Sequence, residues 1–237
     1  MTASKQHLSG DDAAQILLGK ARALLKSDEE RHFFDRLFAG AAGDDIDRSS
    51  AESLAAMARM AWHEALLHKA GDIRVTVLKD GNTEDPESVV VAINDDRPFL
   101  FDSALAAAIA AGARIRMAFH PLLEIAGKPT SVIVLVTDAI AEGAPQVAVR
   151  DSLEASFVQG RDAVRDWKSM LARLKQARDG LAARSPKGAD IAEDLAFLDW
   201  LGDNHFTFLG ARDYALTADG AHGRIDPVAG SGLGALS

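Results

Sequence analysis

Hydrophobic residues recur at spacings of three and four through residues 11–70, and this period predicts helices. A first helix is predicted from about Asp11. A capping-box pair, Ser49 with Glu52, predicts the start of a later helix that ends before Gly71. Between these two helices, an apolar stripe opposite charged residues predicts a packed helix face made of Phe33, Phe34, Leu37 and Phe38.

The hydrophobic period changes to two near Asp72, which predicts that a β-containing unit begins there. A helix is predicted at residues 98–111, with Gly112 as its C-terminal cap. We expect an antiparallel sheet with helices on one face and the other face left for a partner. The strands are predicted at residues 73–77, 89–93, 115–119, 132–136 and 153–157.

Helical spacing returns from about Gly160 and predicts a helix that buries one apolar stripe. Residues 185–188 break this helix, and a further helix is predicted to end near Gly202. A strand at residues 205–209 and a hairpin turn at Asp219-Gly220, before residues 224–227, are predicted to follow. The stripe predicted to be buried consists of Val164, Trp167, Leu171, Leu174 and Leu181.

Composition restricts the function classes. The 237 residues are 48% hydrophobic, enough for ordinary cores. A formal net charge of -9 argues against nucleic acid or an anionic membrane as the main partner. The chain contains no cysteine, which excludes disulfides and thiolate sites and fits a reducing cytoplasm. We expect no export signal and no membrane-spanning segment.

The segment Asn94 to Ser103 is the first candidate site, because an apolar strand meets an acidic, proline-bearing turn that opens into a helix. Pro98 suits the first helical turn, and the unpaired N–H groups after it can face an anion such as a carboxylate. The alternative interpretation is a turn that only connects a strand to a helix.

The other motifs are weaker evidence for a metal, phosphate-binding or catalytic site. His63 and His68 are separated by five residues, so their side chains diverge on a helix and do not suit one metal ion. The glycines of residues 230–234 lack the helix and the Gly-Lys-Ser/Thr ending of a phosphate loop. His120 is interpreted as a structural histidine. An independent hydrolase using any of these three histidines is therefore the least favoured hypothesis.

The sequence Asp96-Arg97-Pro98-Phe99-Leu100 resembles the Asp-Arg-Pro-Gly-Leu-Leu opening of ACT domains, which are small βαββαβ amino-acid-sensing modules. The resemblance implies that an effector contacts this strand-to-helix join, often at a subunit interface. The pattern has glycine where this chain has Phe99. A side chain at this position hinders close approach of a ligand to the backbone.

Four motifs in order resemble the large bacterial NAD-specific glutamate dehydrogenases. They occupy residues 94–103, 119–122, 199–210 and 230–234, and a helix containing residues 163–167 links the second to the third. Phe101 and Ala211 are small departures from the family pattern. The resemblance implies that this chain is the N-terminal portion of a much longer polypeptide whose catalytic region, with its lysine, aspartate and NAD site, lies downstream.

Together these observations predict an α+β fold with three parts: an N-terminal helical region (residues 1–71), a ferredoxin-like ACT domain of βαββαβ type (residues 72–184), and a helical and hairpin extension that starts a further β-containing module (residues 185–237). The predicted function is a regulatory or assembly segment of an NAD-dependent glutamate dehydrogenase. The alternative is a stand-alone amino-acid-binding module.

We expect this chain alone to be inactive, with no catalytic, cofactor-binding or metal-binding residue and with NAD bound only in the full-length enzyme. The expected partners are the remaining dehydrogenase domains, further copies of the chain in a homo-oligomer and an amino-acid effector, but no nucleic acid and no membrane. The candidate effector-binding residues are Asn94, Asp95, Asp96, Arg97, Pro98, Asp102 and Ser103.

Overall fold

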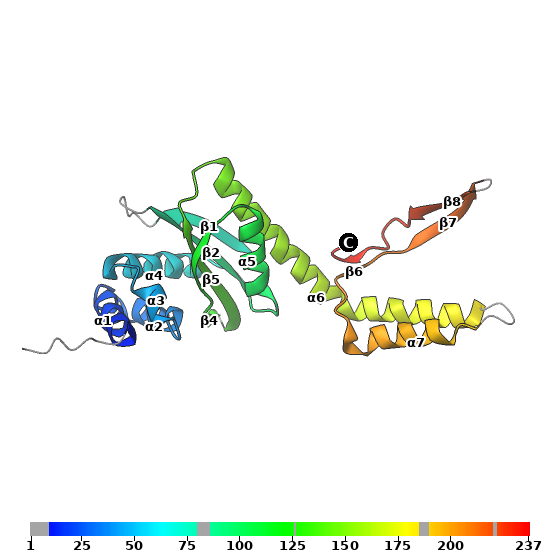
Figure 1. Ribbon diagram of the computed structural model, residues 1–237, viewed down its shortest axis with the longest axis horizontal. Coiled ribbons are helices and arrows are strands. Elements are labelled where there is room, and N and C mark those ends of the chain that lie inside the picture. Colours follow the sequence, from blue (N-terminus) through cyan, green and yellow to red (C-terminus); the bar gives the residue numbers. More distant parts are fainter. Residues whose placement is uncertain (1–9, 80–85, 126, 185–189, 220–221) are drawn as a thin grey trace, which may run out of the picture. The chain divides into compact units, whose positions relative to one another are not determined.

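The computed structural model describes residues 10–79, 86–125, 127–184, 190–219 and 222–237, and divides the chain into two compact units, Met1–Phe157 and Val158–Ser237 (Figure 1). Helices and antiparallel sheets make up both units, so the predicted α+β class is confirmed. Within the described residues, no helix is long and apolar enough to cross a membrane.

The first unit begins with the predicted helical region, which contains α1 (Gly10–Ala23), α2 (Asp28–Leu37), α3 (Gly43–Ile46) and α4 (Ala51–Leu66). The apolar face of α2 is buried, as the stripe predicts. Its capping box is formed by Ser27 and Glu30. The box predicted at Ser49 is wrong, because Ser50 is the N-cap of α4 and its hydroxyl accepts the N–H of Ser53.

The sheet of the first unit has the order β1-β2-β5-β3, with β4 also paired to β5, and every pairing is antiparallel. Strand β2 connects through α5 (Leu100–Ala110) to β3, and β5 lies between these two parallel strands. This is the split β-α-β arrangement of an ACT-like domain. Strand β1, which precedes β2 in sequence, pairs with the other edge of β2. The bounds are β1 Arg74–Lys79, β2 Glu87–Asp95, β3 Ile115–Phe119, β4 Leu122–Ile125 and β5 Lys128–Asp138.

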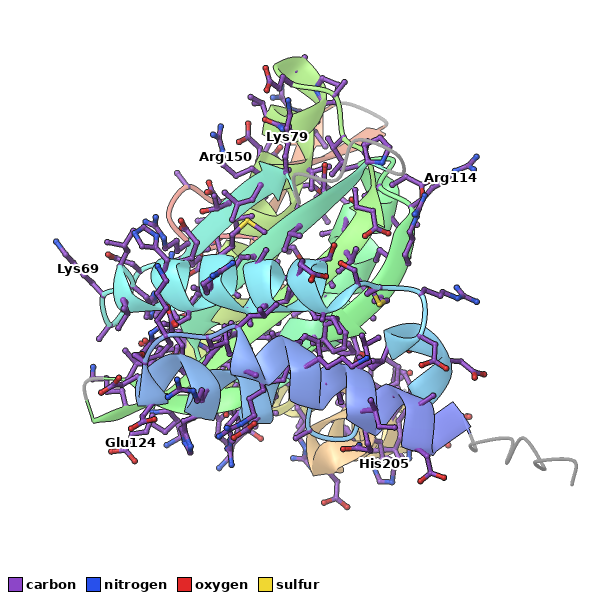
Figure 2. The ribbon with its side chains drawn as sticks, turned by 90° about the vertical axis from the view of Figure 1, so that its left-hand side faces the viewer. Lys69, Lys79, Arg114, Glu124, Arg150 and His205 are labelled. Atoms are coloured by element: carbon purple, nitrogen blue, oxygen red, sulfur yellow. The ribbon has the colours of Figure 1, made fainter. Side chains whose placement is uncertain are left out.

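Helices cover both faces of this sheet, so the expectation of one uncovered face is wrong (Figure 1). Val91 and Val134 pack with the N-terminal helices, whereas Val90 and Leu135 pack with α5 and the first part of α6 (Ala144–Arg184). Figure 2 looks onto the N-terminal helices, which lie in front of the sheet while Lys69 and Glu124 point outward. The central strands are therefore buried on both sides.

The strand predicted at residues 153–157 is also wrong, because these residues lie inside the helix α6. Leu153 and Phe157 are buried while Ala155 is exposed. With Val149, which is also buried, the buried residues follow a spacing of four. A spacing of four on a helix and a spacing of two on a strand are indistinguishable when the intervening residue is alanine.

The described part of the second unit contains the remainder of α6, α7 (Ala192–Trp200), the π-helix η1 (Leu201–His205) and four short strands. Strand β6 (Gly210–Ala211) pairs with β9 (Leu233–Gly234), and β7 (Tyr214–Asp219) pairs with β8 (His222–Pro227) as a hairpin. The predicted hairpin is confirmed, although Gly220 of its turn lies outside the described residues. So does the predicted helix break at residues 185–188.

Two expectations for the second unit are wrong. The strand predicted at residues 205–209 does not form, since His205 belongs to η1 and pairing starts only at Gly210. The predicted buried stripe on α6 is not buried either. Trp167 is 48% exposed, and the buried apolar residues of this stretch are Ala163 and Met170. The apolar residues follow the helical spacing, but the described residues do not cover them.

The contact between α4 and β1 provides a test of the fold. The Glu64 carboxylate is buried and accepts hydrogen bonds from Arg74 Nε at 2.6 Å and from Thr76 Oγ1 at 2.8 Å. Glu64→Gln removes the charge from these bonds, and we expect the free energy of unfolding to fall by about 2 kcal/mol. Urea denaturation followed by circular dichroism measures it. Exposed Glu124→Gln is the control, and equal effects from both variants would contradict a stabilising role for this contact.

Candidate functional site

The join between β2 and α5 sends its polar side chains to opposite faces of the sheet. Asn94 follows Val90 and Ala92 on the face covered by α5, whereas Asp95 follows Val91 and Ile93 on the face covered by the N-terminal helices. The structure therefore does not bring these two predicted site residues together, although they are adjacent in sequence.

Asn94 and Arg97 form the buried part of the join. Asn94 is only 2% exposed, and its Oδ1 accepts a hydrogen bond of 3.0 Å from Arg97 Nη2. Asn94 Nδ2 and Arg97 Nη1 are both buried without a hydrogen-bond partner among the described residues. An unsatisfied buried donor costs about 1–3 kcal/mol. Two such donors in one hydrogen-bonded pair provide a place for an acceptor such as a carboxylate.

His120 and Ser131 extend this polar group across the sheet. Ser131 is buried and lies opposite Asn94 in the pairing of β2 with β5. Its hydroxyl is 2.6 Å from His120 Nε2, and the His120 ring stacks on Phe101 of α5 with ring centroids 5.2 Å apart. We call Asn94, Arg97, Phe101, His120 and Ser131 the join cluster.

His120 is hydrogen-bonded, as expected of a structural histidine, but its connection to Asn94 through Ser131 was not predicted. Burial lowers the pKa of His120 below its ordinary value, and the Asp96 carboxylate partly opposes this shift. The only sequence signal for the association was that residues 94–103 and 119–122 both carry the dehydrogenase resemblance. Strands β2 and β3 both pair with β5, and this pairing places the two segments close together. The spacing of residues along the chain does not predict such pairing.

The other predicted site residues have different surroundings. The Asp95 carboxylate accepts the Gly71 N–H at 3.1 Å and lies 3.6 Å from His68 Nε2, so it connects β2 to the end of the helical region. Asp96 is exposed, and its N–H donates to Pro129 O. Asp102 is an exposed residue of the first turn of α5, and Ser103 is partly buried one residue later.

Phe99 adopts the backbone conformation that the ACT pattern assigns to glycine. Its φ of 68° and ψ of 5° make it the only non-glycine residue with positive φ among the described residues. These angles match the third position of a type II turn, with Pro98 at the second. The helix therefore starts at Leu100, not at Pro98 as predicted. The aromatic ring is 66% exposed, so the turn retains its shape at a conformational cost.

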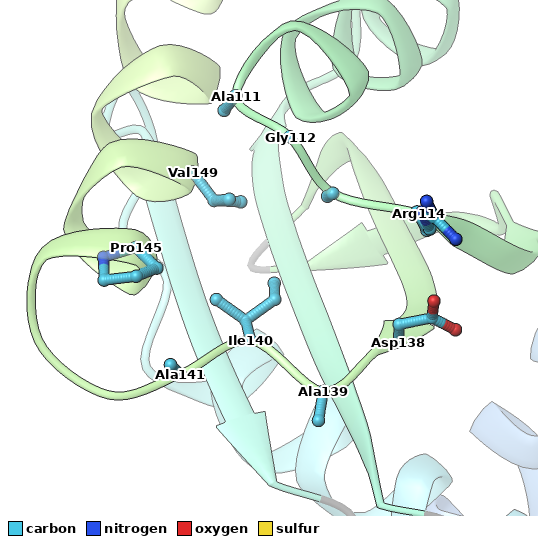
Figure 3. A pocket seen from close by; sticks show the side chains of 10 residues that line it. Ala111, Gly112, Arg114, Asp138, Ala139, Ile140, Ala141, Pro145 and Val149 are labelled. Carbon is cyan, nitrogen blue, oxygen red and sulfur yellow. The ribbon is translucent and has the colours of Figure 1, made fainter.

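Two cavities flank the sheet at different ends. One, of about 310 Å³, is lined by His120, Pro121 and residues of the α2–α3 connection, and His120 is the member of the join cluster that borders it. The other, of about 320 Å³, lies between the ends of α5 and α6, where Ile140 and Val149 point inward and Arg114 and Asp138 lie at one side (Figure 3). The described residues contain no group of three or more histidine, aspartate or glutamate residues able to hold a metal ion.

The second unit brings together three motifs that are distant in sequence. Asp166 of α6 accepts the Gly234 N–H at 2.9 Å, and β9, which contains Gly234, pairs with β6 at Gly210. A hydrogen bond from Arg165 and then the Gly234 N–H lower the pKa of Asp166 to about 2. A Cβ added at Gly234 would lie 2.4 Å from Leu209 O. Gly232 and Gly234 thus serve close backbone packing, whereas Gly230 faces open space.

Comparison with known proteins agrees with this architecture. A family model described as "Glutamate dehydrogenase, ACT1 domain" matches residues 33–159. The chain is 23% identical over 261 aligned positions to an NAD-specific glutamate dehydrogenase of Halomonas elongata. That alignment covers 96% of this chain but only 16% of the relative, so the chain spans a small part of the relative's length.

Phe99→Gly tests the conformational cost at the join. Glycine adopts positive φ freely, whereas an L-residue is penalised, so we expect the free energy of unfolding to rise by up to about 1 kcal/mol after the entropy of glycine is counted. Urea denaturation measures the change. Phe99→Ala removes the ring but keeps the strained conformation, and it should give no such gain. A gain of equal size from alanine would assign the cost to the exposed ring instead.

Gly234→Ala tests the packing of the glycine motif. The added Cβ meets Leu209 O at a φ of +60°, so we expect β6 and β9 to separate and the amides of residues 210–211 and 233–235 to lose hydrogen-exchange protection by roughly tenfold or more. Gly230→Ala is the matched control, since Gly230 also has positive φ but faces open space. Equal loss in both variants would attribute the effect to φ alone.

Proposed function

The chain belongs to the family of glutamate dehydrogenase ACT1 domains, and from this membership we propose that it is a regulatory and assembly segment of an NAD-dependent glutamate dehydrogenase. In the longer protein, other domains would bind NAD and convert L-glutamate, NAD and water to 2-oxoglutarate, ammonium and NADH. The similarity to an NAD-specific glutamate dehydrogenase many times the length of the match supports this division of labour. The absence of cysteine fits a cytoplasmic setting.

The proposed regulatory role is capture of a free amino acid at the join cluster. Asn94 Nδ2 and Arg97 Nη1 are buried donors without a partner among the described residues, and both suit the α-carboxylate. The first turn of α5 has no side-chain cap, so its N–H groups add to the positive potential there. Asp96, exposed and close enough to influence His120, would accept the α-ammonium.

The remaining candidate residues would have supporting roles. Asp95 is already bonded to Gly71, so it would position the end of β2 instead of contacting the ligand. Pro98 would fix the turn, and Asp102 and Ser103 would border the ligand from α5. The three-part division at residues 71 and 184 remains part of this proposal, with the join cluster in the middle part.

Calorimetric titration of the 237-residue chain with a panel of L-amino acids tests this function. We expect at least one to bind, and Arg97→Met to weaken it by roughly tenfold to a hundredfold, since a buried charged hydrogen bond is worth about 1.5–3 kcal/mol. Arg114→Met, which removes an exposed guanidinium at the opposite end of α5, should leave binding unchanged. Heat from no ligand would leave a purely architectural role.

A further inference from the structure

The β7–β8 hairpin presents one apolar face and one polar face. In its register Tyr214 lies opposite Pro227, and Leu216 lies opposite Ile225. These four side chains share one face, and Leu216 and Ile225 are 73% and 66% exposed. The other face carries Ala215, Thr217, Arg224 and Asp226. A hairpin of two strands is marginally stable in water by itself, so it needs additional strands or a covering surface.

The outer edge of β8 has a defined set of free backbone groups. Val228 N–H donates to Asp213 O at 2.9 Å, so these residues form a hydrogen-bonded position at the base of the hairpin. Hydrogen-bonded and non-hydrogen-bonded pairs alternate along an antiparallel ladder. The backbone N–H and C=O groups of Asp226 and Arg224 therefore point toward β7. The N–H and C=O of Ile225 therefore point outward. Within the described residues, no strand other than β7 pairs with β8.

We propose that β8 pairs antiparallel with β8 of a second copy of this chain, with the two Ile225 residues opposite each other. The two Ile225 residues then exchange both backbone hydrogen bonds. This register also places Arg224 opposite Asp226 of the second copy, twice by symmetry, on the polar face. The two apolar faces become one continuous surface on a four-stranded sheet.

Arg224 Nε and Asp226 Oδ1 lie 2.8 Å apart within β8, and the same two side chains can pair across a two-fold axis, which favours this edge and this partner. A two-fold axis requires a surface that complements itself, and a basic and an acidic residue on either side of the central residue meet that requirement. The outer edge of β7 lacks it, because the residues beside its central Leu216 are Ala215 and Thr217. Pro227 has no N–H to donate, which limits the paired stretch to a few residues. In the proposed assembly role, the partner at this interface would be a second copy of the chain. The biological meaning of the dimer rests on that proposed role, whereas the strand pairing itself does not.

Sedimentation velocity on the full 237-residue chain and its charge variants tests the pairing. We expect a concentration-dependent dimer. Arg224→Asp places like charges opposite each other twice, so its dimer should dissociate at roughly tenfold lower affinity. The double variant Arg224→Asp with Asp226→Arg restores opposite charges and should recover the dimer. A monomer at all concentrations, or a dimer indifferent to the single reversal, would overturn the proposal.

Cysteine cross-linking provides a second measurement that does not depend on affinity. The natural chain has no cysteine, so a single introduced thiol reports on its own contacts. Opposed hydrogen-bonded residues have Cα atoms about 5.5 Å apart, within reach of a disulfide. Ile225→Cys should therefore give covalent dimers on mild oxidation, and Leu216→Cys, which is separated from its copy by both β8 strands, should not. Equal cross-linking of both variants contradicts the register, and neither result changes the amino-acid titration that tests the join cluster.

Discussion

The pairing of β2 with β5 is the interaction on which the first unit depends. It runs from Glu87 opposite Asp138 to Asp95 opposite Thr130, and the apolar stretches of both strands are buried on both faces. Neither face of this pair can remain in water, so the sheet needs two covering layers. Helix α5 and the start of α6 provide one, and the N-terminal helices provide the other. The helical region therefore shares one hydrophobic core with the sheet.

The polar end of β2 connects these two layers through one short backbone segment. Asn94 is bonded to Arg97 on the side of α5, while Asp95, the next residue, is bonded to Gly71 on the side of α4. A change in the backbone at Asn94 therefore reaches the Asp95 contact through a single peptide unit.

Local pattern predicted most of the elements but not how they meet. Helices α1, α2, α4 and α5 and strands β1, β2, β3 and β5 follow from period and capping residues, because these depend on near neighbours in sequence. The strand expected at residues 153–157 failed because Leu153 and Phe157 fit both periods. The join cluster could be predicted only in part. Asn94 and Arg97 belong to one motif, whereas Ser131 joins them through strand pairing, which a single sequence does not encode locally.

The two units differ in what holds them together. In the first, buried apolar side chains dominate, whereas in the described part of the second only Ala163 and Met170 are buried apolar residues. The second unit relies instead on polar contacts, namely Asp166 with Gly234, Arg173 with Asp213, and Arg178 with Asp199. Exposed ion pairs contribute about 0–1 kcal/mol each, so they fix geometry more than they stabilise. In the described part of this unit, Trp200, Phe206 and Leu216 therefore form exposed apolar surface, of the kind that often marks interaction sites.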